Sequence, residues 1–146
     1  MGSTDPTNVL VPLDGSECSR RALEFAVALA DRFDADLHVV HFSDHQTDAT
    51  DTIIDRAHET VEAAGLEDDP ELIESTSGIR NANHVGAAIL ELVEDRGYDH
   101  VVMGHHGEGT VGRAILGSAA ETMLRSEAVA VTVVPTVERA ANDGET

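Results

Sequence analysis

The residues with the clearest potential for chemistry lie in a glycine-rich segment in the last third of the chain. Gly104 and Gly107 open this segment, and after nine further residues Gly117 and Ser118 close it. Glycine allows an anion to approach the backbone closely, because no Cβ obstructs the ligand or a positive φ. A helical pattern starts at Ser118, so the free N–H groups and positive end of that helix would meet a bound phosphate. The segment therefore predicts a phosphate-binding loop.

The hydroxyl of Ser118 admits two interpretations. Glu121 follows three residues later, which completes the capping-box pattern of a helix start and needs no ligand. Alternatively, the hydroxyl donates to a phosphate oxygen. The sequence leaves both interpretations open.

Two other phosphate motifs are disfavoured. Residues 107–112 match the G-x-G-x-x-G pattern of dinucleotide-binding proteins, but they follow a late strand rather than the first one. No acidic residue ends the next strand, as that pattern requires. A Walker A loop needs a lysine, and the sequence contains none.

Short apolar runs alternate with longer helical patterns along the chain, which is typical of a parallel α/β sheet. Strands are predicted at residues 9–13, 37–42, 71–76, 100–103 and 128–134. Helices are predicted at residues 17–33, 53–64, 83–94 and 118–125. Right-handed crossovers place helices on both faces, so we expect an α/β fold with an open five-stranded parallel sheet flanked by helices on both faces. We also expect a single domain over residues 1–146, with its core at about 8–136 and strand 71–76 at a sheet edge.

Sheets of this kind bind ligands beyond the carboxyl ends of their strands, at the point where the strand order reverses. Two segments at predicted carboxyl ends carry suitable residues. Asp14 to Ser16 follow the first strand, and Met103 to Gly107 close the fourth. The turn at Asp14 to Ser16 is also suited to capping the helix that follows it. We therefore expect both segments at the binding site.

The charge composition restricts the partners. The 146 residues include 28 acidic and 9 basic side chains, a formal net charge of −19, and every basic residue is arginine. Such a surface repels nucleic acids and anionic membranes, so we expect neither as a partner. It also repels itself unless salt screens the charge. This favours a halophilic protein of a salt-rich interior over an acidic mesophilic protein or a disordered acidic tail.

The compartment is predicted from cysteine usage and hydropathy. Cys18 is alone, which excludes an intrachain disulfide and favours a reducing interior. The sequence shows no signal-peptide pattern and no apolar run of membrane-spanning length. We therefore expect a cytoplasmic protein.

Three motifs in order give the sequence a specific resemblance. Residues 104–118 match the pattern G-x2-G-x9-G-(S/T), residues 9–16 match a characteristic opening, and residues 130–135 match a characteristic last strand. With these motifs the chain resembles the ATP-binding universal stress proteins over nearly its whole length. The resemblance implies the fold of the adenine nucleotide alpha hydrolases, a Rossmann-like three-layer sandwich.

The resemblance also implies a ligand and the residues that bind it. ATP is the expected cofactor, with Mg²⁺ or Mn²⁺ bound through its phosphates, and Asp14 would lie near the ribose or serve as the metal ligand. The backbone at Phe42 would meet the adenine edge, and Met103 would wall the pocket. The implied binding residues are Pro12, Leu13, Asp14, Phe42, Met103, Gly104, His106, Gly107, Gly117, Ser118, Ala119 and Ala120.

Several positions depart from the family pattern. His105 stands where a small hydroxyl residue is common, and Ala119 and Ala120 stand where Val followed by Thr or Ser is common. Loss of the hydroxyl at Ala120 removes one phosphate donor, worth about 0.5–1.5 kcal/mol. His106 titrates near neutrality, so binding would depend on pH. These departures keep open an alternative function: a stress protein that binds no nucleotide and acts as a dimeric protein-interaction module.

The sequence offers little catalytic machinery. Ser16 and Ser118 lack a recognisable acid and base, and no lysine is available to stabilise a transferring phosphoryl group. We expect a nucleotide-dependent stress-response or signalling module with at most slow ATP hydrolysis or autophosphorylation. A hydrolase or adenylating enzyme on a related fold would need machinery that this chain lacks.

The last predicted strand bears on assembly. Val129, Val131 and Val133 alternate with small residues, so the strand is apolar on both faces, and an unprotected edge of this type invites pairing. Family members dimerise through this strand, so the resemblance implies a homodimer, with a strand buried inside the monomer sheet as the alternative.

Histidines are numerous, and four of the eight lie near predicted strand ends. We interpret His41, His100, His105 and His106 as polar pocket or surface residues, because their spacing matches no zinc pattern.

Overall fold

The structure is a computed structural model, and it describes residues 5–43, 46–74, 82–105 and 116–136. Within these residues strands and helices alternate along the chain. Their bounds are β1 Asn8–Leu13, α1 Glu17–Phe33, β2 Asp36–Ser43, α2 Asp48–Ala63, β3 Glu71–Glu74, α3 Ala82–Arg96, β4 His100–Gly104, α4 Ser118–Ser126 and β5 Ala130–Val134. These elements lie close to the predicted ones, with two differences. The second helix begins five residues earlier than predicted, at Asp48, because Thr47 caps it, and the last strand begins two residues later.

The strands form one sheet in the order β3-β2-β1-β4-β5, and all neighbouring pairs are parallel. The predicted five-stranded parallel sheet is thus confirmed, as is the edge position of β3. β5 occupies the opposite edge. The strand order reverses between β1 and β4, because the chain first builds outward to β3 and then returns to the other side of β1. The carboxyl ends of all five strands define one edge of the sheet, which we call the carboxyl edge.

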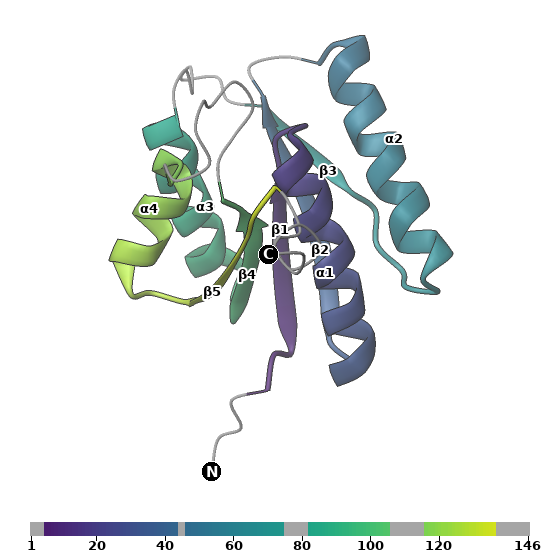
Figure 1. Ribbon diagram of the computed structural model, residues 1–146, viewed down its shortest axis with the longest axis horizontal. Helices are drawn as coiled ribbons and strands as arrows, with labels where there is room; N and C mark the ends of the chain where they lie inside the picture. Colours follow the sequence, from purple (N-terminus) through teal and green to yellow (C-terminus); the bar gives the residue numbers. More distant parts are fainter. Residues whose placement is uncertain (1–4, 44–45, 75–81, 106–115, 137–146) are drawn as a thin grey trace, which may run out of the picture.

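Helices cover both faces of the sheet, as Figure 1 shows with α1 and α2 on one side and α3 and α4 on the other. Alternate residues of each strand supply two separate cores. One core packs the strands against α1 and α2, and it includes Val9, Val11 and Val39. The other packs them against α3 and α4, and it includes Leu10, Val40 and Val101. Because both faces are covered, the central strands are apolar without interruption.

Close helix packing sets the position of α4. Gly86 of α3 faces Thr122 of α4, and a Cβ at Gly86 would lie only 2.7 Å from the Cβ of Thr122. A side chain at position 86 would push the two helices apart. Glycine therefore lets α4 settle against α3, with its first residues at the carboxyl edge.

No helix in the described part of the chain is long and apolar enough to cross a membrane.

Candidate functional site

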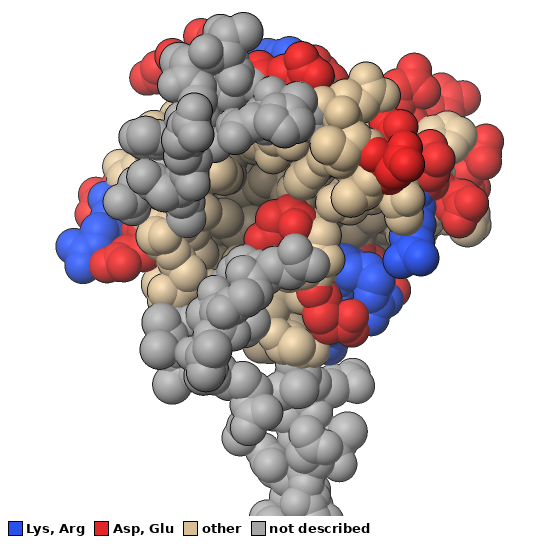
Figure 2. Space-filling model, turned by 90° about the horizontal axis from the view of Figure 1, so that it is seen from above, with Lys and Arg blue, Asp and Glu red and all other residues tan. Residues whose placement is uncertain are grey.

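Several predicted binding residues share one face of the sheet. Phe42 and Ala119 pack against the core of α3 and α4, and Met103 and Ala120 belong to it. Pro12 is buried and lies two residues beyond Leu10 of the same core, so it points to the same face. These positions converge at the carboxyl edge, on the α3 and α4 side. Figure 2 looks down on this edge and shows a hollow whose described walls are largely uncharged.

Leu13 does not share this face. Its side chain is buried in the core beneath α1 and α2. Only its backbone remains available to a ligand on the other face. The prediction that Leu13 contacts the nucleotide is therefore restricted to its main-chain atoms.

The turn after β1 is built by polar contacts of three residues. The Asp14 N–H donates to Ser19 Oγ at 3.3 Å, and Asp14 Oδ1 accepts from the Ser16 N–H at 2.9 Å. Ser16 caps α1 as predicted, because its Oγ accepts from the Ser19 N–H at 3.1 Å. Gly15 has a φ of 87°, which a side chain would strain. Asp14 is exposed, and its second carboxylate oxygen makes no hydrogen bond within the described residues.

The base of the glycine-rich segment is closed by two backbone hydrogen bonds. The His105 N–H donates to the Val134 carbonyl at 2.8 Å, and the Gly117 N–H donates to the His105 carbonyl at 2.8 Å. The first bond ties the segment to the end of β5, and the second brings its two ends together. The predicted residues His106 and Gly107 lie outside the described residues.

Gly104 is required by packing rather than by a ligand alone. A Cβ at this position would lie 2.6 Å from the Cβ of Cys18 and 2.9 Å from the backbone nitrogen of Ser19. The end of β4 therefore rests directly on the first turn of α1. Its predicted role in cradling phosphate remains a prediction, while its role in packing follows from these distances.

The predicted capping box at Ser118 is wrong. Gly117, with φ −67° and ψ 156°, is the N-cap residue, and the Glu121 N–H donates to its carbonyl at 2.9 Å. Ser118 is already the first helical residue, and the Glu121 carboxylate accepts instead from Arg125 Nε at 2.9 Å. Because glycine has no side chain, the first turn of α4 receives no side-chain cap. The Ser118 hydroxyl makes no hydrogen bond to any described residue, and its role as a phosphate donor stays a prediction.

Comparison with known proteins identifies the family. Residues 6–135 match the model of the universal stress protein family. The chain belongs to this family. A Staphylococcus epidermidis protein assigned to the universal stress proteins is 30% identical over 142 residues, which span 90% of this chain and 85% of that protein.

Solved structures of universal stress proteins share the fold. One in complex with cAMP has a TM-score of 0.71 and 24% identity, and the match covers 91% of this chain and 99% of that one. Another, from Archaeoglobus fulgidus in complex with dAMP, has a TM-score of 0.66 and 17% identity, covering 89% and 98%.

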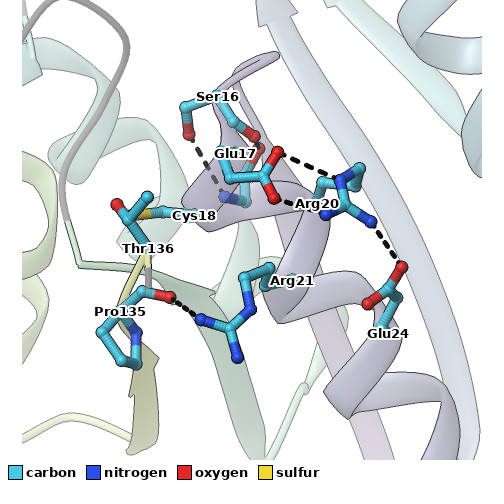
Figure 3. A network of polar contacts seen from close by, with 9 residues as sticks. Ser16, Glu17, Cys18, Arg20, Arg21, Glu24, Pro135 and Thr136 are labelled. Carbon is cyan, nitrogen blue, oxygen red and sulfur yellow. Dashed lines mark hydrogen bonds and ion pairs between the residues drawn. The ribbon is translucent and has the colours of Figure 1, made fainter. Parts of the chain in front are cut away.

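The first turn of α1 in this universal stress protein is tied to the end of β5, as Figure 3 shows. Arg21 donates to the Pro135 carbonyl at 3.0 Å, and Cys18 Sγ lies 2.7 Å from Thr136 Oγ1. The same turn supports Gly104. The end of β5, the end of β4 and the start of α1 are therefore held as one unit beside the site.

One of the two arginines of this turn is paired with carboxylates, while Arg21 contacts a backbone carbonyl. Arg20 contacts the carboxylates of Glu17 and Glu24, the second at 2.6 Å. Its guanidinium is therefore engaged on the α1 surface. Arg20 is therefore not a free cation for a phosphate, whose charge the N–H groups of the first turn of α4 would help to offset.

Asp14 is the predicted metal ligand, and no cluster of metal-binding side chains surrounds it among the described residues. The described residues contain no group of three His, Cys, Asp or Glu side chains that could hold a metal ion. One exposed carboxylate suits a divalent cation only when phosphate and water oxygens complete its coordination. The residues present therefore fit a metal that arrives with a nucleotide, and they do not fit an independent metal site. The described histidines His41 and His100 are separately engaged with Leu13 and Thr132.

A groove of about 330 Å³ lies on the opposite face, between α1 and α2. Leu13, Ser19, Ile53 and Arg56 are among its lining residues. It is separated from Phe42 and Met103 by the sheet, so it is not part of the candidate nucleotide site.

Sequence reasoning missed Ser19 and Gly86, which shape the site, and it named His41 as a polar pocket or surface residue without its hydrogen bond to Leu13. The spacing of Ser16 and Ser19 is a capping signal that could have revealed the first of them. The contacts of His41 and Gly86 join distant segments, and no local pattern predicts such contacts.

Proposed function

We propose that this chain binds ATP, with Mg²⁺ or Mn²⁺ on its phosphates, as a nucleotide-dependent module of the stress response or of signalling. One observation carries the proposal. The uncapped first turn of α4 lies at the carboxyl edge beside the apolar wall that Phe42 and Met103 form. The complexes of related proteins with cAMP and dAMP support an adenine nucleotide as the ligand class.

The proposed ligand uses each part of the site differently. The adenine lies against Phe42 and Met103, where an apolar wall favours an aromatic base. Asp14 contacts the ribose or the metal. The phosphates contact the N–H groups of the first turn of α4 and the hydroxyl of Ser118. The positive end of the helix dipole strengthens this binding of an anion. The contacts of His106 and Gly107 with the phosphates, which the family resemblance implies, concern residues outside the described part of the chain.

The module binds more than it reacts. Near Ser118 and Ser16 the described residues include no lysine that could stabilise a transferring phosphoryl group. They also include no paired acid and base that could activate either hydroxyl. We propose at most slow hydrolysis, a cytoplasmic location, and a homodimer that pairs through β5. Its edge position in the sheet leaves one side of that strand without a partner strand.

Release of bound ligand is the direct test. Purified protein is denatured, and the released small molecules are identified by mass spectrometry. Calorimetry then measures the binding of added ATP with Mg²⁺ to the native protein at high salt. We expect ATP, ADP or AMP at near-stoichiometric amounts, or measurable binding. Absence of both would contradict the proposal and favour the alternative, a protein-interaction module.

Two variants test the site itself. Ser118→Ala removes the proposed phosphate donor and should weaken ATP binding about two- to tenfold, the value of one hydrogen bond. Ser126→Ala is the matched control on the same helix. Ser126 Oγ donates to the Met123 carbonyl at the far end of α4, so this change should affect stability and leave ATP affinity unaltered. Equal affinities for both variants would mean that the first turn of α4 does not meet the ligand.

A further inference from the structure

The peptide group that joins Leu13 to Asp14 is held from both sides. The Leu13 carbonyl accepts a hydrogen bond from His41 Nδ1 at 2.7 Å. The N–H of the same peptide group, which belongs to Asp14, donates to Ser19 Oγ at 3.3 Å. A peptide group is planar, so fixing its oxygen and its hydrogen fixes the orientation of the whole plane. The direction in which the chain leaves β1 is thereby set by one residue from β2 and one from α1.

His41 can serve this contact in only one tautomer. A carbonyl oxygen accepts and never donates, so Nδ1 must carry the proton. His41 is buried, with 7% of the residue exposed, and its Nε2 makes no hydrogen bond within the described part of the chain. The last register pair between β1 and β2 joins Leu13 and His41, so the ring lies where the ladder of these strands ends.

A packing role alone does not explain a histidine at this position. Leu37 and Val39, which precede it on the same face of β2, belong to the apolar core beneath α1 and α2. A leucine at position 41 would fill this space without the cost of burying a polar ring. The ring forms instead one directed hydrogen bond, and that bond ends on the residue immediately before Asp14.

We infer that His41 is a positioning residue of the nucleotide site, which fixes the Leu13–Asp14 peptide so that the Asp14 carboxylate is held ready for the ligand. The inference rests on the proposed function. His41 acts from the face opposite to Phe42 and Met103, and it reaches the site only through the main chain. Ser19 completes the clamp from α1.

The decisive variants separate the hydrogen bond from the bulk of the ring. His41→Leu fills the space and removes the donor, whereas His41→Asn offers an amide N–H at a place close to Nδ1. We expect His41→Leu to weaken calorimetric binding of ATP with Mg²⁺ about three- to tenfold, the equivalent of one net hydrogen bond. His41→Asn should recover most of that loss.

A double-mutant cycle with Asp14→Asn separates positioning from general stability. If His41 acts through Asp14, His41→Leu should cost much less affinity when Asp14 is already replaced. Thermal unfolding of each variant without ligand shows that it is folded, and ¹⁵N spectra of the wild-type imidazole should show a protonated Nδ1. Should His41→Leu fail to fold, Ser19→Ala removes the other side of the clamp and takes its place in the cycle.

The outcomes are distinct. Wild-type protein that binds no nucleotide would overturn both the proposed function and this inference. Wild-type protein that binds while His41→Leu binds equally well would overturn the positioning role alone. Additive losses in the cycle, or a neutral ring protonated at Nε2, would have the same consequence.

Discussion

Deprotonation of His38 should loosen the β3 edge of the sheet. His38 lies on β2, and its Nδ1 is 2.7 Å from Asp68 Oδ1 while its Nε2 is 3.0 Å from Glu71 Oε1. Both partners are carboxylates, which only accept when ionised, so both ring nitrogens must carry protons. Arg96 adds a second contact to Glu71 at 3.0 Å. We call His38, Asp68, Glu71 and Arg96 the His38 cluster; it joins β2, β3 and the end of α3.

The hydrogen bond to Asp68, followed by that to Glu71, raises the pKa of His38 although burial opposes the shift. The bonds from Arg96 and His38 lower the pKa of Glu71. Tyr98 also faces this cluster, and burial raises its pKa, so it stays neutral near neutral pH. Among these groups His38 is therefore the one that changes charge near neutral pH.

The loss of stability on deprotonation of His38 follows from the number of hydrogen bonds that the imidazole loses. A neutral imidazole keeps one N–H, so deprotonation removes one of two charge-assisted hydrogen bonds and turns a lone pair toward a carboxylate. Such a bond contributes about 1.5–3 kcal/mol when shielded and less than about 1 kcal/mol when exposed. The Asp68 side chain is 8% exposed and the Glu71 side chain 39%, so the cluster falls between these limits. We expect a loss of about 1–2 kcal/mol.

The sign of the change in stability with pH follows from the pKa shift of His38 between the unfolded and folded states. The folded-state pKa of His38 lies above its unfolded value, so the cluster contributes its full stability below about pH 6.5. That contribution declines as the pH rises through the folded-state pKa. His100 acts in the opposite sense, because burial lowers its pKa and its neutral form is favoured in the folded state.

Urea unfolding between pH 5.5 and pH 9 at constant ionic strength measures the effect, in wild-type protein and in His38→Gln. The glutamine is neutral throughout, and subtracting its profile cancels His100 and the remaining groups. The difference in unfolding free energy should shrink by about 1–2 kcal/mol as the pH rises. A difference that is constant over this range, or that grows with pH, would refute the assignment of a doubly protonated His38.

Further predictions concern packing, acid stability, assembly and salt. Gly104→Ala should destabilise the protein by about 1–3 kcal/mol in urea, because its Cβ would lie 2.6 Å from that of Cys18; an unchanged midpoint would contradict this packing. The bonds from Thr7 and Asn8 outweigh burial and lower the pKa of Asp99, so its contribution should disappear as the pH falls below about 4, and Asp99→Ala should flatten that part of the stability profile. Sedimentation should show a dimer at micromolar concentration, and a persistent monomer would exclude pairing through β5. Molar KCl should raise the melting temperature, since it screens a net charge of −19, and a fall would count against adaptation to salt.

The sheet could be predicted from the sequence because its signals are local. Runs such as Val9–Leu13 are short and continuously apolar, which identifies strands buried on both faces. The alternation of these runs with helical patterns then indicates parallel pairing. The weak, acidic pattern around Glu71 similarly pointed to an edge, and β3 lies there.

The cap residue of α4 was predicted less well than the strands, because a capping box depends on backbone angles and not only on residue spacing. Ser118 and Glu121 have the required spacing, yet the extended residue is Gly117. One residue of displacement moves Ser118 into the helix and leaves Glu121 to pair with Arg125. The contacts of His41 and Gly86 were inaccessible for another reason, since each joins segments that meet only after folding.

The glycines of the phosphate-binding pattern do not share one physical cause. Gly104 is confined by Cys18 and Ser19, so the fold itself excludes a side chain there whether or not a nucleotide binds. Gly117 has a φ of −67°, which any residue adopts, so its backbone conformation sets no such demand. A relative that had lost nucleotide binding would still need the first glycine to pack β4 on α1. The pattern as a whole is therefore weaker support for a ligand than its length implies, and the decisive part lies at Gly117 and Ser118, where the helix start is left uncapped.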